Sequence, residues 1–138
     1  MSVTETDAYR PSEDEPFMNE RQQEYFRKKL LDWKNDILEQ SKMTIGQMQD
    51  ATLHAPDVVD RASSETDHAL ELRTRDRQRK LISKIDSALR RIDEGEYGYC
   101  SETGDPISLQ RLEARPTATM SLEAQERHER REKVHRDD

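Results

Sequence analysis

The sequence predicts a mainly α-helical protein, with a long antiparallel coiled-coil hairpin, a small globular head and a C-terminal helix. Only 31% of the 138 residues are hydrophobic and 38% are charged, a composition that suits extended helices with a narrow apolar stripe. Four Gly and five Pro are too few for a β-rich fold full of tight turns. Two long stretches also repeat apolar residues at spacings of three and four, and one short break, residues 54–62, separates them.

The charge and the lack of long apolar runs exclude several classes of protein. A net charge of −7 argues against a protein that coats DNA, because neutralising phosphates needs a basic surface. No apolar run approaches the roughly 20 residues of a membrane span, and the N-terminus lacks the layout of a signal peptide. The single cysteine, Cys100, cannot form an internal disulfide. We therefore expect a cytoplasmic protein.

The N-terminal residues 1–16 (MSVTETDAYRPSEDEP) are acidic and contain two prolines. Such a composition predicts a flexible tail that is disordered or loosely attached. The alternative is an acidic lid or a contact with a partner.

The first helix of the hairpin is expected to begin just after Phe17. Asn19 and Gln22 have the spacing of a capping box. The apolar stripe then continues through Phe26, Leu30, Trp33, Ile37, Ile45 and Met48, with Ser41 in one of its positions. About 35 helical residues would be about 50 Å long.

The break at 54–62 (HAPDVVDRA) is predicted to be the tip of the hairpin, because Pro56 favours a turn. Asp60 or Ser63 can cap the second helix. Its stripe consists of Leu70, Thr74, Arg77 or Gln78, Leu81, Ile85, Ala88 and Ile92, and Gly95 ends it. Two such helices joined by a short turn must be antiparallel, so residues 17–95 form the predicted hairpin.

The middle of the second helix carries four arginines, Arg73, Arg75, Arg77 and Arg79. They can be a solvated face that pairs with Asp36, Glu39 or Asp50. They can also be a basic belt that grips an acidic partner surface. The two interpretations are compatible.

Residues 96–138 are expected to form the head and a final helix. Gly98, Gly104 and Pro106 mark turns, Ile107–Leu109 could form a short strand, and 119–135 return to a helical pattern. The side chains expected to hold the head against the hairpin are Tyr97, Tyr99, Ile107, Leu109, Leu112, Met120 and Leu122.

Four runs, DVVDRA, LELRTRDRQRKLISKID, GEYGYC and RLEARPTA, resemble the DksA/TraR family in order and spacing. The resemblance covers roughly residues 17–135 and favours the members with a full-length hairpin over the short TraR-type members. It implies a monomeric transcription regulator that binds RNA polymerase and not promoter DNA. It further implies that the hairpin tip enters the secondary channel and that the nucleotide ppGpp assists in modulating initiation, for example at rRNA promoters.

The resemblance also assigns site residues. Asp57, Asp60 and Ala62 match family positions at the tip, and Leu81, Lys84 and Arg115 match positions that bind ppGpp. Gln125 stands where these proteins commonly have Lys, which removes one positive charge from the ppGpp site.

The sequence departs from the family at its zinc finger. The positions of the four usual cysteines hold Cys100, Thr103, Ser121 and Ala124. One thiolate, two hydroxyls and a methyl group cannot supply the tetrahedral soft ligands of structural zinc. We therefore expect a degenerate zinc-finger-like region without bound zinc.

Catalysis is not expected, because the chain has neither a phosphate-binding Gly-rich loop nor a nucleophile elbow. Two other functions stay open. A transcript-cleavage factor of the Gre type also presents acidic residues on a hairpin tip and could bind magnesium there. A plain coiled-coil adaptor would need only the hairpin.

Overall fold

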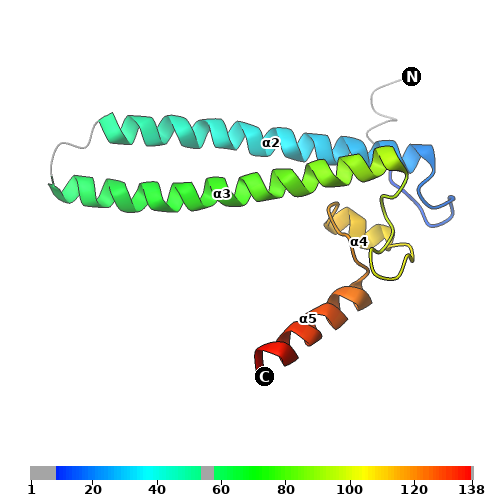
Figure 1. Cartoon of the computed structure of the whole chain (residues 1–138). Helices are drawn as coiled ribbons and strands as arrows, with labels where there is room; N and C mark the ends of the chain where they lie inside the picture. Colours follow the sequence, from blue (N-terminus) through cyan, green and yellow to red (C-terminus); the bar gives the residue numbers. More distant parts are fainter. Residues whose placement is uncertain (1–8, 54–57, 138) are drawn as a thin grey trace, which may run out of the picture. The chain divides into compact units, whose positions relative to one another are not determined.

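The computed structural model contains two long helices and two shorter ones. It describes the backbone of residues 9–53 and 58–137, and their side chains except at 44, 47–53, 58–62, 64 and 135–137. Helices α2 (Glu20–Leu53) and α3 (Val58–Glu94) are followed by α4 (Leu109–Ala114) and α5 (Leu122–Asp137) (Figure 1). The prediction of a mainly α-helical protein with a helical hairpin is confirmed. No helix in the described ranges is both long and apolar enough to cross a membrane.

The chain divides into two compact units. The head unit comprises Met1–Leu30 and Ser87–Asp138, and the hairpin unit comprises Leu31–Asp86. Within the head unit the start of α2 meets the end of α3, where Arg27 donates to Asp93 at 2.7 Å. Within the hairpin unit Lys34 pairs with Asp86 at 2.7 Å, and Ser41 bonds Gln78 at 2.8 Å. As residue numbers rise along α2 they fall along α3, so the helices are antiparallel in both units.

The N-terminus of α2 is capped much as its sequence predicts. The Gln22 backbone N–H donates to the Asn19 side-chain oxygen at 2.8 Å. The Gln22 side chain accepts from the Met18 N–H, also at 2.8 Å, so the return bond reaches one residue further than in a standard capping box. Met18 itself has a positive φ of 54°. Gln22 is completely buried and therefore ties the entry of the chain to the first turn of α2.

Residues 9–16 contact the rest of the head unit. Residues 1–8 of the predicted flexible tail lie outside the described residues. Tyr9 donates to Glu15 at 2.7 Å, and Gln22 Nε2 donates to the Ser12 carbonyl at 3.3 Å. The Arg21 guanidinium lies 3.9 Å from the centre of the Tyr9 ring, a cation–π contact. The hydrogen bond from Tyr9 also lowers the pKa of Glu15.

The core of the head unit joins the base of the hairpin to the loops that follow it. The most deeply buried apolar side chains include Phe26, Leu30, Ala88, Ile92, Tyr97, Ile107 and Leu112. Tyr97 packs its ring 5.6 Å from that of Phe26 and donates its hydroxyl to the Pro116 carbonyl at 2.8 Å. Of the side chains expected in this core, Tyr99 and Leu122 are instead exposed, at 38% and 56%. Ala118 and Ala124 are buried and were not anticipated.

The segment after α3 differs from its prediction. Gly95 adopts a left-handed φ of 77° and ends α3, as expected. The predicted strand at Ile107–Leu109 is wrong: in the described chain only an isolated bridge joins Tyr99 to Pro106. The Ser108 hydroxyl accepts from the Arg111 N–H at 3.2 Å and starts α4 at Leu109. This N-cap directs the short apolar run into a helix. Ser121 caps α5 in the same way, so that helix begins at Leu122 and not at 119.

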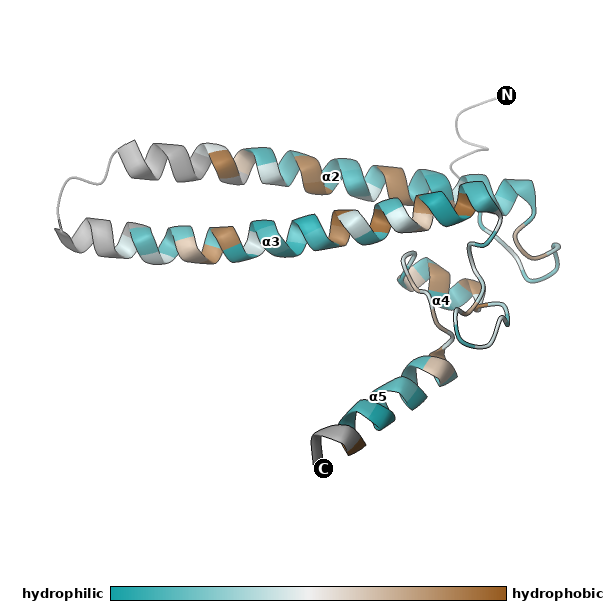
Figure 2. Ribbon diagram, in the orientation of Figure 1, coloured by the Kyte–Doolittle hydropathy of each residue, from teal (hydrophilic) through white to brown (hydrophobic). Residues whose placement is uncertain are grey.

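Few apolar side chains of the hairpin unit are completely buried among those that the structure describes. Ile37 and Ile85 are buried, and they are the only apolar side chains described in this unit that reach that level. Further towards the tip, Ser41 of α2 donates a hydrogen bond to Gln78 of α3. Gln78, and not Arg77, therefore occupies the position of α3 that faces α2. In Figure 2 the hydrophobic bands on α2 and α3 are accordingly interrupted by hydrophilic ones.

Candidate functional site

The predicted tip lies at the edge of what the structure describes. Asp57 falls outside the described residues. Asp60 and Ala62 belong to α3, which begins at Val58, before either of the two caps proposed from the sequence. Their side chains are not among those described, so the role of these three residues stays a prediction.

The four arginines of the predicted basic belt do not share one face of α3. Residues two positions apart point to different sides of a helix, whereas residues three or four apart share a side. Arg73 and Arg77 therefore align with Lys80 and Lys84, and all four are exposed. Arg75 and Arg79 belong to another row, so the belt is split between two sides of α3.

The expected ion pairs of the belt are not formed with the acids of α2 that the structure describes. Neither Asp36 nor Glu39 pairs with any of the four arginines, and the Asp50 side chain lies outside the described set. Arg77 donates instead to the Thr74 hydroxyl at 3.3 Å, within α3. The arginines of both rows are therefore available to a partner as far as the described side chains are concerned.

The predicted ppGpp residues are divided between the two units. Leu81 is half-buried and Lys84 exposed, and both belong to α3 in the hairpin unit. Arg115, in the head unit, is exposed at the C-cap of α4. Gln125, also in the head unit, donates to Glu129 at 3.1 Å along α5.

Arg115 lines a cavity of about 510 Å³ in the head unit. Its walls are Ser108, Gln110, Arg111, Ala114, Arg115 and Leu122. Arg111 donates through Nε to the Met120 carbonyl at 2.9 Å, which fixes the guanidinium beside the cavity. Two guanidinium groups in one cavity suit a phosphate-bearing anion. The sequence analysis overlooked Arg111, although its spacing of four from Arg115 on one short helix was a usable signal.

At the four positions that hold zinc-binding cysteines in the family, the side chains make other contacts. The Ser121 hydroxyl accepts from the Ala124 N–H at 3.2 Å, and the Thr103 hydroxyl accepts from the Asp105 N–H at 3.2 Å. Ala124 is fully buried and offers only a methyl group. In the described part of the chain no three His, Cys, Asp or Glu side chains gather in a way that could hold a metal ion. This donor set does not fit tetrahedral zinc.

The Cys100 sulfur accepts hydrogen bonds from groups around it. Its residue is 3% exposed, and this burial raises the pKa of the thiol. Hydrogen bonds from the Thr103 side chain and from backbone groups of Ser121, Thr103 and Glu102 outweigh burial and lower the pKa to about 6. The donors come from both loops that would carry zinc ligands. Ser101 N–H also bonds the Thr119 carbonyl at 2.8 Å, so the two loops are joined without a metal.

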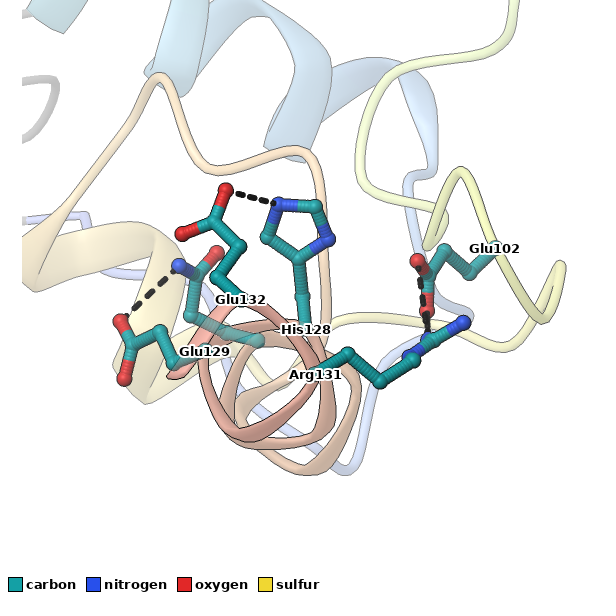
Figure 3. Close-up of polar contacts among 6 residues, drawn as sticks. Glu102, His128, Glu129, Arg131 and Glu132 are labelled. Carbon is teal, nitrogen blue, oxygen red and sulfur yellow. Dashed lines mark hydrogen bonds and ion pairs between the residues drawn. The ribbon is translucent and has the colours of Figure 1, made fainter. Parts of the chain in front are cut away.

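Helix α5 carries its polar contacts on its surface (Figure 3). Arg131 reaches Glu102 at 3.4 Å and so links α5 to the loop after Cys100. His128 lies 3.1 Å from Glu132 one turn further along α5. All four side chains are substantially exposed, so each pair contributes at most about 1 kcal/mol.

Almost the whole chain is similar in sequence to DksA proteins. Residues 22–92 match the family described as DnaK suppressor protein DksA, N-terminal domain, and residues 95–130 match the prokaryotic dksA/traR C4-type zinc finger. The RNA polymerase-binding transcription factor DksA of Caulobacter vibrioides is 71% identical over 136 residues, covering 99% of this chain and 96% of the relative. The protein of the same name from Escherichia coli strain K12 is 40% identical, covering 96% and 88%.

A solved structure shares both the sequence similarity and the fold. The transcription factor DksA2 from Pseudomonas aeruginosa superimposes with a TM-score of 0.81 at 41% identity. The match covers 90% of this chain and 94% of that one.

Proposed function

Because the chain belongs to the DksA/TraR family, we propose that it is a transcription regulator that acts by binding RNA polymerase. The observation that carries the proposal is the 71% identity, over 99% of this chain, to a relative named as an RNA polymerase-binding transcription factor. The hairpin unit supports the proposal, since α2 and α3 each expose rows of side chains that a partner could contact. We further propose that the protein acts as a monomer in the cytoplasm, is not an enzyme and does not recognise DNA sequence.

We propose a mechanism in which the hairpin makes the main contacts with the polymerase. Residues 17–95 enter the secondary channel of the polymerase, with Asp57, Asp60 and Ala62 at the leading end. The exposed arginines of α3 grip acidic surfaces on the way, because none of them pairs with Asp36 or Glu39. Acidic groups delivered near catalytic magnesium would disturb the elements around it and so alter initiation.

For ppGpp we propose that Leu81 and Lys84 of the hairpin unit and Arg115 of the head unit each contribute contacts. Support comes from the chemistry of the side chains: Lys84 is an exposed cation, and Arg115 lines a cavity together with a second guanidinium, that of Arg111. Cations and planar guanidinium groups are suited to pyrophosphate. Gln125 supplies no charge, so we expect the dependence on ppGpp to be weaker than with Lys at that position.

We also propose that residues 96–138 fold and function without zinc. Cys100, Thr103, Ser121 and Ala124 lack a tetrahedral donor set, and hydrogen bonds already join their two loops. A chelator should therefore leave activity unchanged. Metal analysis of the purified protein, together with transcription assays with and without chelator, measures this, and stoichiometric zinc would contradict it.

Transcription in vitro tests the proposed function. Purified protein is added to RNA polymerase on an rRNA promoter, with and without ppGpp, and initiation is measured. The proposal expects a change in initiation that ppGpp strengthens. The same protein is added to backtracked elongation complexes. Shortening of the transcript there, with no effect on initiation, would favour a Gre-type cleavage factor.

The variant Asp60→Asn tests the tip. It removes one charge with little change in shape, so binding to RNA polymerase should be retained and the effect on initiation lost. Asp76→Asn, on the exposed surface of α3 far from the tip in sequence, is the matched control. A fully active Asp60→Asn protein would mean that Asp60 serves the fold alone.

A further inference from the structure

One side of the hairpin unit carries two aligned rows of side chains. Along α2, Leu31, Lys34 and Leu38 follow one another at spacings of three and four. Along α3, Leu72, Arg75, Arg79, Ile82 and Asp86 do the same. Residues at these spacings share one side of a helix. Each row is therefore a continuous stripe on its own helix.

The two rows lie on the same side of the hairpin. Lys34 from the first row pairs with Asp86 from the second at 2.7 Å, and this contact joins the stripes directly. The Ser41–Gln78 hydrogen bond, at 2.8 Å, lies next to them and fixes which positions of α2 and α3 face each other. We call this side the leucine–arginine face: Leu31, Leu38, Leu72, Arg75, Arg79 and Ile82, with the Lys34–Asp86 pair.

The leucine–arginine face exposes apolar surface. Leu31 and Leu38 are each 41% exposed, and Leu72 is 51% exposed. Charged residues separate these leucines, so the face offers apolar contact area interspersed with charge. Burial of such side chains against a partner gains on the order of 25 cal/mol for each Å² of apolar surface removed from water.

The charge of the same face favours an acidic partner. Arg75 and Arg79 form no ion pair with any described side chain, although the chain as a whole carries a net charge of −7. Positive charge is thus concentrated beside the leucines in an otherwise acidic protein. Arginine next to apolar side chains is a frequent centre of binding energy at protein interfaces.

We propose that the leucine–arginine face docks an acidic, partly apolar segment of RNA polymerase, on a different side of α3 from Arg73, Arg77 and Lys84. The proposal rests on the polymerase binding proposed above and assigns one contact surface to it. Leu31, Leu38 and Leu72 cover apolar side chains of that segment, while Arg75 and Arg79 pair with its carboxylates. A membrane surface fits less well, because a membrane-binding helix carries a broad apolar face and here charged residues separate the leucines.

Substitutions within the face test the proposal in the full-length chain. Binding of Leu38→Ser and of Arg79→Gln to RNA polymerase core enzyme is measured at low and at high salt. Each substitution should weaken binding roughly five- to thirty-fold. Arg79→Gln should in addition make binding less sensitive to salt, because an ion pair with the partner has been removed. Thermal unfolding by circular dichroism checks that both variants fold like the wild type.

Matched controls come from outside the face. Leu70→Ser replaces a leucine on α3 that is 54% exposed and belongs to neither row, and Lys133→Gln removes an exposed cation on α5. Both controls should bind within about two-fold of the wild type, below the effect of an interface centre. Equal weakening by Leu70→Ser and Leu38→Ser would overturn the proposal, because any exposed leucine would then have the same effect.

Three further outcomes overturn the proposal. If the wild type binds RNA polymerase and both Leu38→Ser and Arg79→Gln bind equally well, the proposed contact surface is overturned and the proposed function is not. Absence of wild-type binding overturns the proposed function and this contact with it. Adsorption of the wild type, but not of Leu38→Ser, to vesicles of phosphatidylglycerol and phosphatidylcholine would assign the face to a membrane instead.

Discussion

The head unit and the hairpin unit use the same kinds of residue in opposite ways. In the head unit apolar side chains such as Phe26, Leu112 and Tyr97 are almost completely buried. In the hairpin unit Ile37 and Ile85 are the buried apolar side chains that the structure describes, and Leu31, Leu38 and Leu72 face outwards. Burial of apolar side chains stabilises the first unit, whereas the second leaves leucines and arginines exposed. We therefore expect substitutions of leucine to cost less stability in the hairpin unit than in the head unit.

A pair of equivalent substitutions tests this difference most strongly. Leu112→Ala removes a fully buried side chain and should lower the free energy of unfolding by about 2–5 kcal/mol. Leu38→Ala removes a side chain that is 41% exposed and should cost less than about 1 kcal/mol. Urea unfolding followed by circular dichroism measures both. Similar losses for the two variants would break the comparison.

Gln22 is the only buried polar side chain described, and it tests how the head unit holds its N-terminal segment. Gln22→Ala leaves the Met18 N–H without its 2.8 Å acceptor and should cost about 1–3 kcal/mol. Gln110→Ala, at an exposed position of α4, is the control and should change stability by less than about 0.5 kcal/mol. Proteolysis near residue 16 should also become faster in Gln22→Ala alone.

The Cys100 thiol gives the head unit a dependence on pH. Its pKa in the fold is about 6, below its usual value of 9.0. A lowered pKa means that the folded state favours the thiolate. Its contribution to stability is complete above about pH 9 and is lost as the pH falls towards 6. Ultraviolet absorbance of the thiolate should therefore titrate with a midpoint near 6.

The variant Cys100→Ser separates this effect from other titrations. The difference in unfolding free energy between the wild type and Cys100→Ser should grow from pH 6 to pH 9. A thiol that titrates near its usual value of 9.0, with no such growth, would contradict the hydrogen-bonded thiolate.

The smallest effect is expected for the polar contact inside the hairpin. Replacing both partners, Ser41→Ala with Gln78→Leu, removes their 2.8 Å hydrogen bond and leaves neither side chain unpaired. Such paired replacements are close to neutral, within about 1 kcal/mol. The single variant Gln78→Ala serves as the comparison, since it leaves Ser41 without this partner. A large loss in the double variant would mean that the hairpin unit depends on this contact as the head unit depends on its core.

Much of the fold could be predicted because it depends on local patterns. Spacings of three and four gave the two long helices, Asn19 marked the start of α2, and Gly95 marked the end of α3. The predicted strand at Ile107–Leu109 was wrong because the Ser108 hydroxyl accepts from the Arg111 N–H and caps α4. Counting basic residues suggested one belt, whereas helical geometry separates Arg75 and Arg79 from Arg73 and Arg77.

Periodicity and residue chemistry are local properties, so they were enough to predict the helical hairpin, the family resemblance and the loss of the zinc ligands. The tertiary structure was needed to show that residues 9–16 contact the rest of the head unit through Gln22 and that Gln78 faces Ser41. It alone also showed Cys100 surrounded by donors from two loops, and it joined two rows of side chains through Lys34 and Asp86. Each of these contacts unites residues distant in the chain. Their pairing depends on how the helices and loops pack, and no local pattern records it.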